Sequence, residues 1–485
     1  MIIQQQKNGA AIPDCMAELR LFAKMFFDED EDVQISSYFN YADGRVMVYT
    51  QIDYRGSVYT YELNHAFNAE AADERMKKKV FTACVTRSFI HAAQKIRRVN
   101  IPWGAMCGIR PAKNYRELWE SGLSEAEVRR VFAEVYEVSP EKIALAEAVA
   151  HNERAVLERI DPKSVGIYIG IPFCPTRCVY CSFVSTDIRV SGKYMAEFVD
   201  KLLLEIDKTA QILRDLGLYA DNIYIGGGTP TTLSAEDIRR VCDRLHEGFD
   251  FSRIREFTLE AGRPDTITRE KLQAALDGGV DRISINPQSM NQSVLERVGR
   301  THSPQMVRDC FRIARELGIG NINMDLIAGL PGETAEMFKR SLDEVIALDP
   351  ENITVHSLSI KRAADYKRRE KRLADAQAVN EMLSYTQARM AQTQREPYYM
   401  YRQKNTSGNL ENVGYAKAGF MNAYNINIME EKQTIIALGG GGSSKLVLKD
   451  SIERVFNFKD PLEYIRRFDE ILAKKDEIKE ILCHD

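Results

Sequence analysis

The stretch Tyr168–Phe183, YIGIPFCPTRCVYCSF, places three cysteines within eight residues. Cys174, Cys178 and Cys181 follow the pattern C-x3-C-x2-C, directly after an apolar run that is typical of a buried β-strand. Thiolates gathered on one short loop bind metal ions or iron–sulfur clusters. The stretch therefore predicts a metal centre at the end of a strand, and the rest of the chain has to supply the fold around it.

Five more apolar segments follow this strand candidate, and helical patterns separate them. The six candidates lie at residues 165–173, 222–230, 256–264, 282–289, 321–329 and 352–360. Such strand–helix alternation predicts a parallel sheet, either open or closed into a barrel. Ligand sites in parallel α/β folds gather where the strands end. The three cysteines therefore fall on the expected functional rim.

The chain is expected to have four parts. Residues 1–100 alternate like an α+β domain, with turns at Asp43-Gly44 and Arg55-Gly56, and residues 101–162 form a helical connector. Residues 163–362 carry the strand–helix alternation, and residues 363–485 form a C-terminal region. Its polar, Tyr-rich and Gly-rich stretch at 396–445 has two open interpretations: it covers a site, or it packs against the barrel.

Composition excludes several classes of protein. The net charge is −4 over 485 residues, which is not the basic footprint of a nucleic-acid-binding protein. No run of about 18 apolar residues predicts a membrane span, and the N-terminus does not resemble a signal peptide. We expect a cytoplasmic protein, because the other six of the nine cysteines are scattered singly and suit small buried hydrophobes: Cys15, Cys84, Cys107, Cys242, Cys310 and Cys483.

The three close cysteines leave two metal chemistries to weigh. A structural zinc site needs a fourth ligand, usually from a second C-x2-C or a His pair, and the sequence has no second pair. A [4Fe-4S] cluster held by three thiolates keeps one iron open. An open iron can chelate the amino and carboxylate groups of S-adenosylmethionine, whose reductive cleavage yields a 5′-deoxyadenosyl radical. The spacing favours the cluster, with zinc or a chance triplet as the alternative.

The triplet and the motifs after it resemble those of the radical S-adenosylmethionine superfamily. Within it they look like the oxygen-independent coproporphyrinogen III oxidase family, which includes related haem chaperones. The long HemZ-type members are the best match, because their WG…G[IV]RP segment is present as Trp103, Gly104, Gly108, Arg110 and Pro111. The resemblance implies an α/β fold: a partial (β/α)6 TIM-like barrel with an N-terminal α+β domain and a C-terminal extension that covers the barrel.

The resemblance also implies which residues hold the cofactors. Cys174, Cys178 and Cys181 would ligate the cluster and generate the radical. Glycines allow a close backbone approach, a carboxylate accepts hydrogen bonds, and arginine pairs with a carboxylate. Taken singly, each matching position is also explained by a turn or by the core. The expected contacts to S-adenosylmethionine are Tyr168, Tyr180, Gly227, Gly228, Thr229, Glu260, Gln288, Arg300 and Asp325.

The implied reaction is oxidative decarboxylation of coproporphyrinogen III to protoporphyrinogen IX without oxygen. It would need a low-potential electron donor such as flavodoxin or ferredoxin, and the oxidases also bind a second S-adenosylmethionine. Arg402 and Lys404, which lie beside Tyr398, Tyr399 and Tyr401, are candidates for binding the propionates of the tetrapyrrole.

Three departures from the family pattern keep other functions open. Gly170 stands where typical members have His, and Ser182-Phe183 follows the triplet where the oxidases have a further Cys. The chaperones carry a His-Asn segment in the C-terminal half, whereas residues 414–425 have no His. The alternatives are radical methylation, anaerobic opening of the haem ring, and haem chaperoning without turnover.

Overall fold

The computed structural model describes residues 1–8, 14–70, 72–181, 185–359, 375–403 and 406–484. The chain forms two compact units. Unit 1 contains residues 1–150 and 401–411, and unit 2 contains residues 151–400 and 412–485. Unit 1 thus joins the expected N-terminal domain to most of the expected connector, and it takes in a short segment of the C-terminal region.

Unit 1 is built on a four-stranded sheet in the order β1-β2-β3-β4. The two predicted turns join β2 to β3 and β3 to β4, and Asp43 and Arg55 have positive φ angles of 50° and 51°. Their glycine neighbours also have positive φ, which is the conformation of two-residue hairpin loops. The strands are β1 (Ile2–Asn8), β2 (Val33–Ala42), β3 (Arg45–Tyr54) and β4 (Ser57–Ala66).

Helix α1 lies between β1 and β2 in the chain, and the other helices of unit 1 come after β4. Helix α2 packs against β3 and β4. Ser124 caps α4 with a capping box that it forms with Glu127, and Pro140 opens α5. A buried ion pair, Lys142 Nζ to Glu411 Oε1 at 2.6 Å, ties the returning segment 401–411 to α5. The helices are α1 (Met16–Phe26), α2 (Glu74–Gln94), α3 (Pro111–Glu120), α4 (Glu125–Arg130), a π-helical turn (Val131–Val135) and α5 (Pro140–Leu157), which runs on into unit 2.

Unit 2 contains all six predicted strands as neighbours in one sheet, which confirms the α/β prediction. They pair in parallel in chain order, as strands joined by helical crossovers do. The strands are β5 (Ser164–Ile171), β8 (Tyr219–Gly227), β9 (Glu256–Gly262), β10 (Arg282–Ile285), β11 (Ile322–Ala328) and β12 (Asn352–Ser357).

The C-terminal region extends this sheet at both edges. β15 (Ile435–Gly439) pairs in parallel with β5, and β16 (Ser443–Val447) and β17 (Ile452–Phe456) continue outward from it. At the other edge β14 (Glu411–Ala416) pairs with β12, and β13 (Glu396–Arg402) lies outside β14. In the described part of the chain the eleven strands form an open sheet, with no closed barrel.

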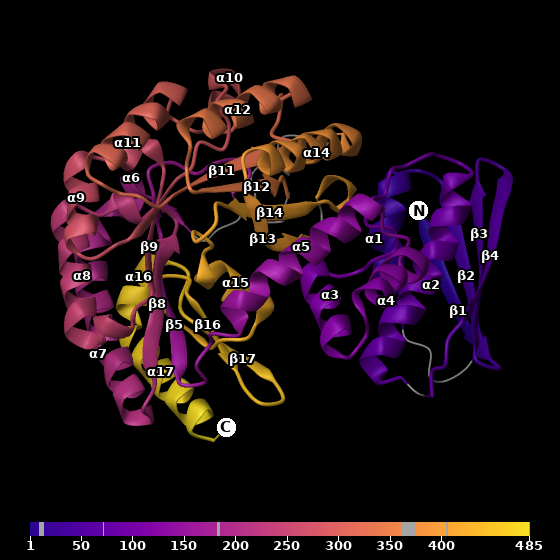
Figure 1. Cartoon of the computed structure of the whole chain (residues 1–485), viewed down its shortest axis with the longest axis horizontal. Coiled ribbons are helices and arrows are strands. Elements are labelled where there is room, and N and C mark those ends of the chain that lie inside the picture. The colour runs from indigo at the N-terminus through magenta and orange to yellow at the C-terminus, as the bar shows by residue number, and fades with distance from the viewer. Residues whose placement is uncertain (9–13, 71, 182–184, 360–374, 404–405, 485) are drawn as a thin grey trace. The chain divides into compact units, whose positions relative to one another are not determined.

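The two faces of the parallel sheet differ in polarity. Ile169, Ile225 and Leu259 are buried and lie in register across β5, β8 and β9, on the apolar outer face. Helices such as α7 (Met195–Leu216), α8 (Ala235–Gly248) and α9 (Arg269–Asp277) cover the outer face (Figure 1). The inner face carries polar side chains, and α15 (Ala423–Glu430) packs against it: the amides of Ala423 and Tyr424 donate to the Glu256 carboxylate at 3.1 and 3.3 Å. The C-terminal region thus covers part of the inner face.

The remaining elements of unit 2 lie between these strands or, as α16 and α17 do, after the last of them. The helices are α6 (Ile188–Ser191), α7 (Met195–Leu216), α8 (Ala235–Gly248), α9 (Arg269–Asp277), α10 (Gln292–Arg297), α11 (Pro304–Glu316), α12 (Ala335–Leu348), α14 (Ala376–Gln392), α16 (Pro461–Arg466) and α17 (Phe468–Cys483). Two short strands, β6 (Phe173–Cys174) and β7 (Thr186–Asp187), pair with each other. Single 3-10 turns lie at 192–194, 230–232, 251–253 and 264–266, and a further one at 407–409 belongs to unit 1.

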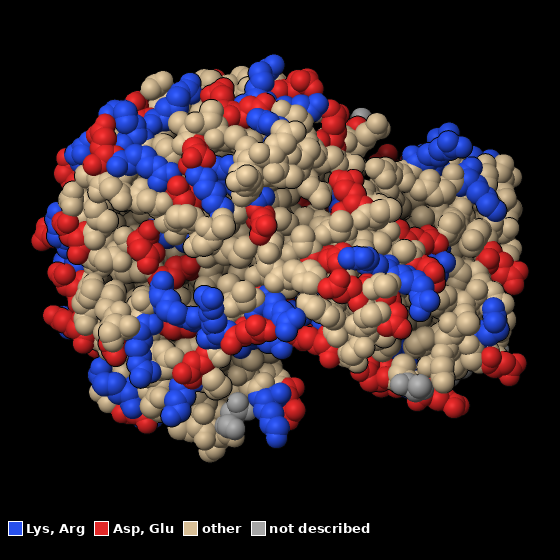
Figure 2. Space-filling view, in the orientation of Figure 1, with Lys and Arg blue, Asp and Glu red and all other residues tan. Residues whose placement is uncertain are grey.

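The surface shown in Figure 2 mixes basic and acidic side chains, without a large area of a single sign. Among the described residues, no helix is long and apolar enough to cross a membrane.

Candidate active site

The cysteine loop begins where β5 ends. Cys174 lies in β6, and its Sγ is 3.4 Å from the Thr229 hydroxyl oxygen. Cys178 and Cys181 share a turn, in which the Cys181 amide donates to the Cys178 carbonyl at 3.0 Å. Cys174 and Cys178 are buried, with exposures of 9% and 7%, and Cys181 is partly buried. The loop therefore presents all three thiols on the predicted rim of the sheet.

The glycines after β8 hold the cysteine loop at close range. The Gly228 amide donates to the Ile171 carbonyl at 2.8 Å, and a Cβ added at Gly228 would lie 2.6 Å from the Phe173 carbonyl oxygen. Gly227 has φ +108°, which favours glycine. Both glycines are thus required by contact with the loop, in addition to any contact with a cofactor.

We expect Gly228→Ala to loosen the cysteine loop, because backbone atoms must move to admit the methyl group. Overpacking of this kind costs about 1–3 kcal/mol. Gly320→Ala is the matched control, since a Cβ there meets nothing within 4 Å. Thermal unfolding and iron content of the two variants check this, and a Gly228→Ala protein equal to the control in both would contradict it.

Glu260, at the end of β9, lies in an environment that favours its neutral form. Burial, together with the nearby charge of Asp325, raises the pKa of Glu260 to about 8, although a backbone hydrogen bond from Gly227 acts in the opposite direction. A cationic ligand would stabilise the ionised carboxylate. The predicted residues Glu260, Asp325 and Gly227 thus come together from three strands.

Three tyrosines stack beside Glu260. The rings of Tyr224 and Tyr424 lie 4.5 Å apart between centroids, and Tyr168 is 6.2 Å from both, all within 18° of parallel. Burial raises the pKa of each of the three hydroxyls, with a further contribution from Glu260. Only Tyr168 was predicted from the sequence, because Tyr424 reaches the inner face from α15, more than 250 residues further along the chain.

Gln288 and Arg300 flank the loop that follows β10. Gln288 has φ +64°, and its amide donates to the Asp325 carbonyl at 2.9 Å. Arg300 donates from Nε to the Tyr180 hydroxyl at 3.1 Å and from Nη1 to the Asn286 carbonyl at 2.9 Å. The side-chain oxygens of Gln288 and Asn286 are buried without a hydrogen-bond partner, so this loop has capacity left for a ligand.

Gly170 is explained by the C-terminal region. The Gly440 amide donates to the Gly170 carbonyl at 2.9 Å, and a Cβ at Gly170 would lie 2.6 Å from the Gly440 carbonyl oxygen. No side chain fits at position 170 unless this backbone moves, and therefore a histidine cannot occupy it here. The departure from the family pattern reflects how the strand after α15 packs against β5.

The structure argues against the expected role of Arg402. Its side chain is buried in unit 1, where Nε donates to the Asn409 carbonyl at 2.8 Å and Nη1 to the Met106 carbonyl at 2.9 Å. Its guanidinium also lies over the Trp103 ring at 5.5 Å. Arg402 thus stabilises the segment that carries the WG motif, and its assignment as a propionate-binding residue stays a prediction that this burial does not favour. Lys404 lies outside the described residues.

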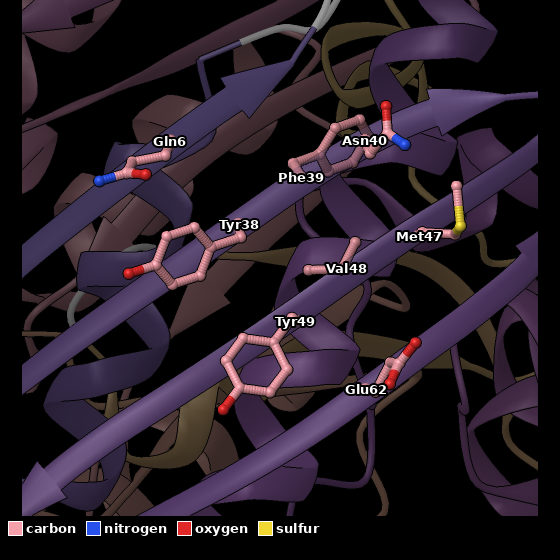
Figure 3. Close-up of a pocket in the computed structure, with 8 residues that line it drawn as sticks. All are labelled: Gln6, Tyr38, Phe39, Asn40, Met47, Val48, Tyr49 and Glu62. Carbon is pink, nitrogen blue, oxygen red and sulfur yellow. The ribbon is translucent and has the colours of Figure 1, made fainter.

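A groove of about 300 Å³ lies on the sheet of unit 1 (Figure 3). Tyr38 and Tyr49, which are 41% and 37% exposed, form its aromatic floor with ring centroids 5.9 Å apart. No cysteine or histidine is among its lining residues, Gln6, Tyr38, Phe39, Asn40, Met47, Val48, Tyr49 and Glu62. The groove therefore lacks the ligands for redox chemistry, which the cysteine loop of unit 2 supplies.

The cysteine loop fits a [4Fe-4S] cluster better than a single ion. A tetrahedral zinc ion with Zn–S bonds of about 2.3 Å brings its sulfurs to about 3.8 Å from one another. Among the described residues, the three thiols are not a group whose sulfurs all lie within 4.8 Å. The wider spacing suits thiolates that bind different irons of one cluster, and the unpartnered oxygens of Gln288 and Asn286 suit a polar ligand beside it.

Comparison with known proteins shows to which family the chain belongs. Residues 168–345 match the model of the Radical SAM superfamily. The oxygen-independent coproporphyrinogen-III oxidase-like protein HemZ of Bacillus subtilis is 36% identical over 474 residues, which cover 94% of each chain. The chain belongs to the oxygen-independent coproporphyrinogen III oxidase family of radical SAM proteins. Members of this superfamily bind a [4Fe-4S] cluster and S-adenosylmethionine, and the chain has the fold and the thiols for both.

The chain is also similar to proteins that are named for a different role. The heme chaperone HemW of Haemophilus influenzae is 31% identical over 62% of this chain and 76% of its own. Coproporphyrinogen III oxidase HemN of Escherichia coli, a solved radical SAM enzyme, superposes with a TM-score of 0.54 at 24% identity, over 66% of this chain and 72% of that one. The match to HemN supports the fold.

Proposed function

We propose that the protein catalyses oxygen-independent oxidative decarboxylation of coproporphyrinogen III, converting two propionates into the vinyl groups of protoporphyrinogen IX. The observation that carries this is the end-to-end similarity to HemZ, which covers the N-terminal unit as well as the radical SAM region. Each vinyl group requires loss of one hydrogen atom, one carbon dioxide and one electron. The cluster and S-adenosylmethionine, when bound, supply the organic radical that removes the hydrogen atom.

We infer that the chain's own residues hold S-adenosylmethionine. The ionised Glu260 accepts hydrogen bonds from its ammonium group, and Arg300 pairs with its carboxylate, with Tyr180 fixing the guanidinium. Gln288 and Asp325 bind polar groups from the neighbouring strands, while Gly227, Gly228 and Thr229 allow a close approach beside Cys174. The Tyr168–Tyr224–Tyr424 stack forms an apolar wall that excludes water from the inner face.

An anaerobic assay with coproporphyrinogen III tests the proposal. The cluster-loaded protein, reduced through flavodoxin or ferredoxin, should release 5′-deoxyadenosine and a tetrapyrrole lighter by two carboxyl groups and two hydrogens. The Cys181→Ala protein is the control without turnover. Transfer of a methyl group, or cofactor consumption only when haem is supplied, would replace the oxidase proposal by another radical reaction on a tetrapyrrole.

Haem chaperoning is the second candidate, because the HemW relatives share the radical SAM region. One observation weighs against haem ligation by the segment at 414–425: Asn422 caps α15 and Tyr424 is in the tyrosine stack, so both are occupied. Stable, stoichiometric haem binding without 5′-deoxyadenosine formation would favour the chaperone.

A further inference from the structure

Arg263 is a buried arginine that contacts the cysteine loop from the end of β9. It follows Gly262, whose φ is +56°, and its side chain is only 4% exposed. Its Nε and Nη2 bond the two carboxylate oxygens of Asp265 at 3.0 and 2.8 Å. A third edge of the guanidinium remains, and Nη1 on that edge faces the loop.

Nη1 makes three contacts with the cysteine loop. It donates to the carbonyl and the hydroxyl oxygen of Thr176, both at 3.0 Å, and it lies 3.7 Å from Cys178 Sγ. A distance of 3.7 Å is within hydrogen-bond range for sulfur. The Thr176 hydroxyl in turn donates to the Gly299 carbonyl at 3.2 Å. The guanidinium thus holds one cluster-binding thiol at a fixed place.

The orientation of the Arg263 guanidinium is fixed by its partners. Burial alone would raise the pKa of Asp265, but the Arg263 guanidinium beside it holds that pKa below its usual range, so the carboxylate stays ionised. The two-pronged pairing orients the planar guanidinium, and Thr301 accepts a further bond from Nη2 at 3.1 Å. Asp265 therefore acts as the clamp that aims Nη1 at the loop.

We propose that Arg263 tunes the reduction potential of the cluster through Cys178. Hydrogen bonds to cluster sulfurs are among the factors that set this potential. One electron from a low-potential one-electron carrier adds negative charge to the cluster and its thiolates, with no bond broken and no proton transferred. A charge-assisted hydrogen bond to Cys178 strengthens as that charge grows, so it favours the reduced form. Arg263 is a positioning residue, and its role is independent of which substrate is used.

The midpoint potential of the reconstituted cluster tests this proposal. In Arg263→Gln we expect reduction to become about tenfold less favourable, which is a fall of ~59 mV for one electron. Arg263→Lys keeps the positive charge but loses the planar guanidinium. The midpoint potential of its cluster should lie between those of the wild type and Arg263→Gln. Arg269→Gln, which removes an exposed arginine paired with Glu316 on the surface, is the control and should match the wild type. A fully loaded Arg263→Gln protein with wild-type potential would overturn the proposal.

A second measurement covers variants that fail to take up a cluster, since Arg263 also anchors Thr176. In the wild-type protein with 15N-labelled arginine, pulsed EPR of the reduced cluster should detect a coupled arginine nitrogen. S-adenosylmethionine is left out, so that its own amino nitrogen cannot contribute. The absence of any arginine coupling would also overturn the proposal. Neither measurement depends on decarboxylation, so each can fail while the proposed function stands.

Discussion

Alanine at Cys174, Cys178 or Cys181 should abolish the [4Fe-4S] cluster in each single variant. We expect each thiolate to bind a different iron, and the part of the chain that the structure describes shows no fourth cysteine at the loop to replace a lost one. Iron content, the visible absorption of the oxidised cluster and the EPR signal of the reduced cluster should all fall to background after anaerobic reconstitution. Retention of the full cluster in any one variant would remove that cysteine from the ligand set.

Cys242→Ala and Cys310→Ala are the matched controls for this experiment. Both thiols are buried, on α8 and α11, and burial raises the pKa of each to about 12, so both are neutral packing groups. These variants should keep a full cluster, at the cost of a small loss of stability.

Glu260→Gln should weaken S-adenosylmethionine binding by ten- to a hundredfold. A hydrogen bond to a charged group is worth about 1.5–3 kcal/mol, which corresponds to that range of affinity. The amide keeps the size of the side chain and loses its ability to ionise. Equilibrium binding to the cluster-loaded protein measures the effect, and Glu316→Gln on the surface of α11 is the control.

The same variant should change how binding depends on pH. The pKa of Glu260 is about 8 in the free protein, so its side chain is mostly protonated below that pH. A cationic ligand favours the ionised form. Ligand binding therefore releases a proton below that pH, and wild-type affinity should rise with pH until about 8. In Glu260→Gln this component should be missing. Parallel pH profiles for the two proteins would mean that Glu260 does not ionise on binding.

The raised pKa of Glu260 also makes the stability of the folded protein without ligand depend on pH. Between its ordinary value of 4.5 and about 8, the folded protein without ligand keeps a proton that the unfolded chain has lost. Stability from this group is therefore present below about pH 4.5 and declines as the pH rises toward 8. Glu260→Gln should remove this slope from the stability profile.

The sequence predicted the central sheet well because its signals are local. Each of the six strands is a short apolar run between turn residues, and the hairpins of unit 1 follow from Asp43-Gly44 and Arg55-Gly56. The rim position of Cys174 follows from the same logic, since the end of one parallel strand defines the rim for all of them.

Residues that depend on distant packing could not be predicted. Tyr424 reaches Tyr224 only because α15 packs on the inner face, and no local pattern announces that contact. The burial of Arg402 could not be predicted, because an arginine among tyrosines has the same local sequence whether it is exposed or buried. Arg263 offered one signal: a cation two residues before Asp265, just after a strand that ends at the rim.

The pairing of β15 with β5 has a consequence for how the chain is made. Gly439 and Gly440 contact Gly170, and the buried pair of Glu205 and Lys475 fastens α7 to α17, so the first strand of the sheet depends on the last segments to be synthesised. Contacts this remote in sequence form late in folding. The cysteine loop leaves the ribosome before the backbone that braces it exists. We therefore expect acquisition of iron to be most efficient once the polypeptide is complete, because a nascent chain lacks the backbone that packs against Gly170.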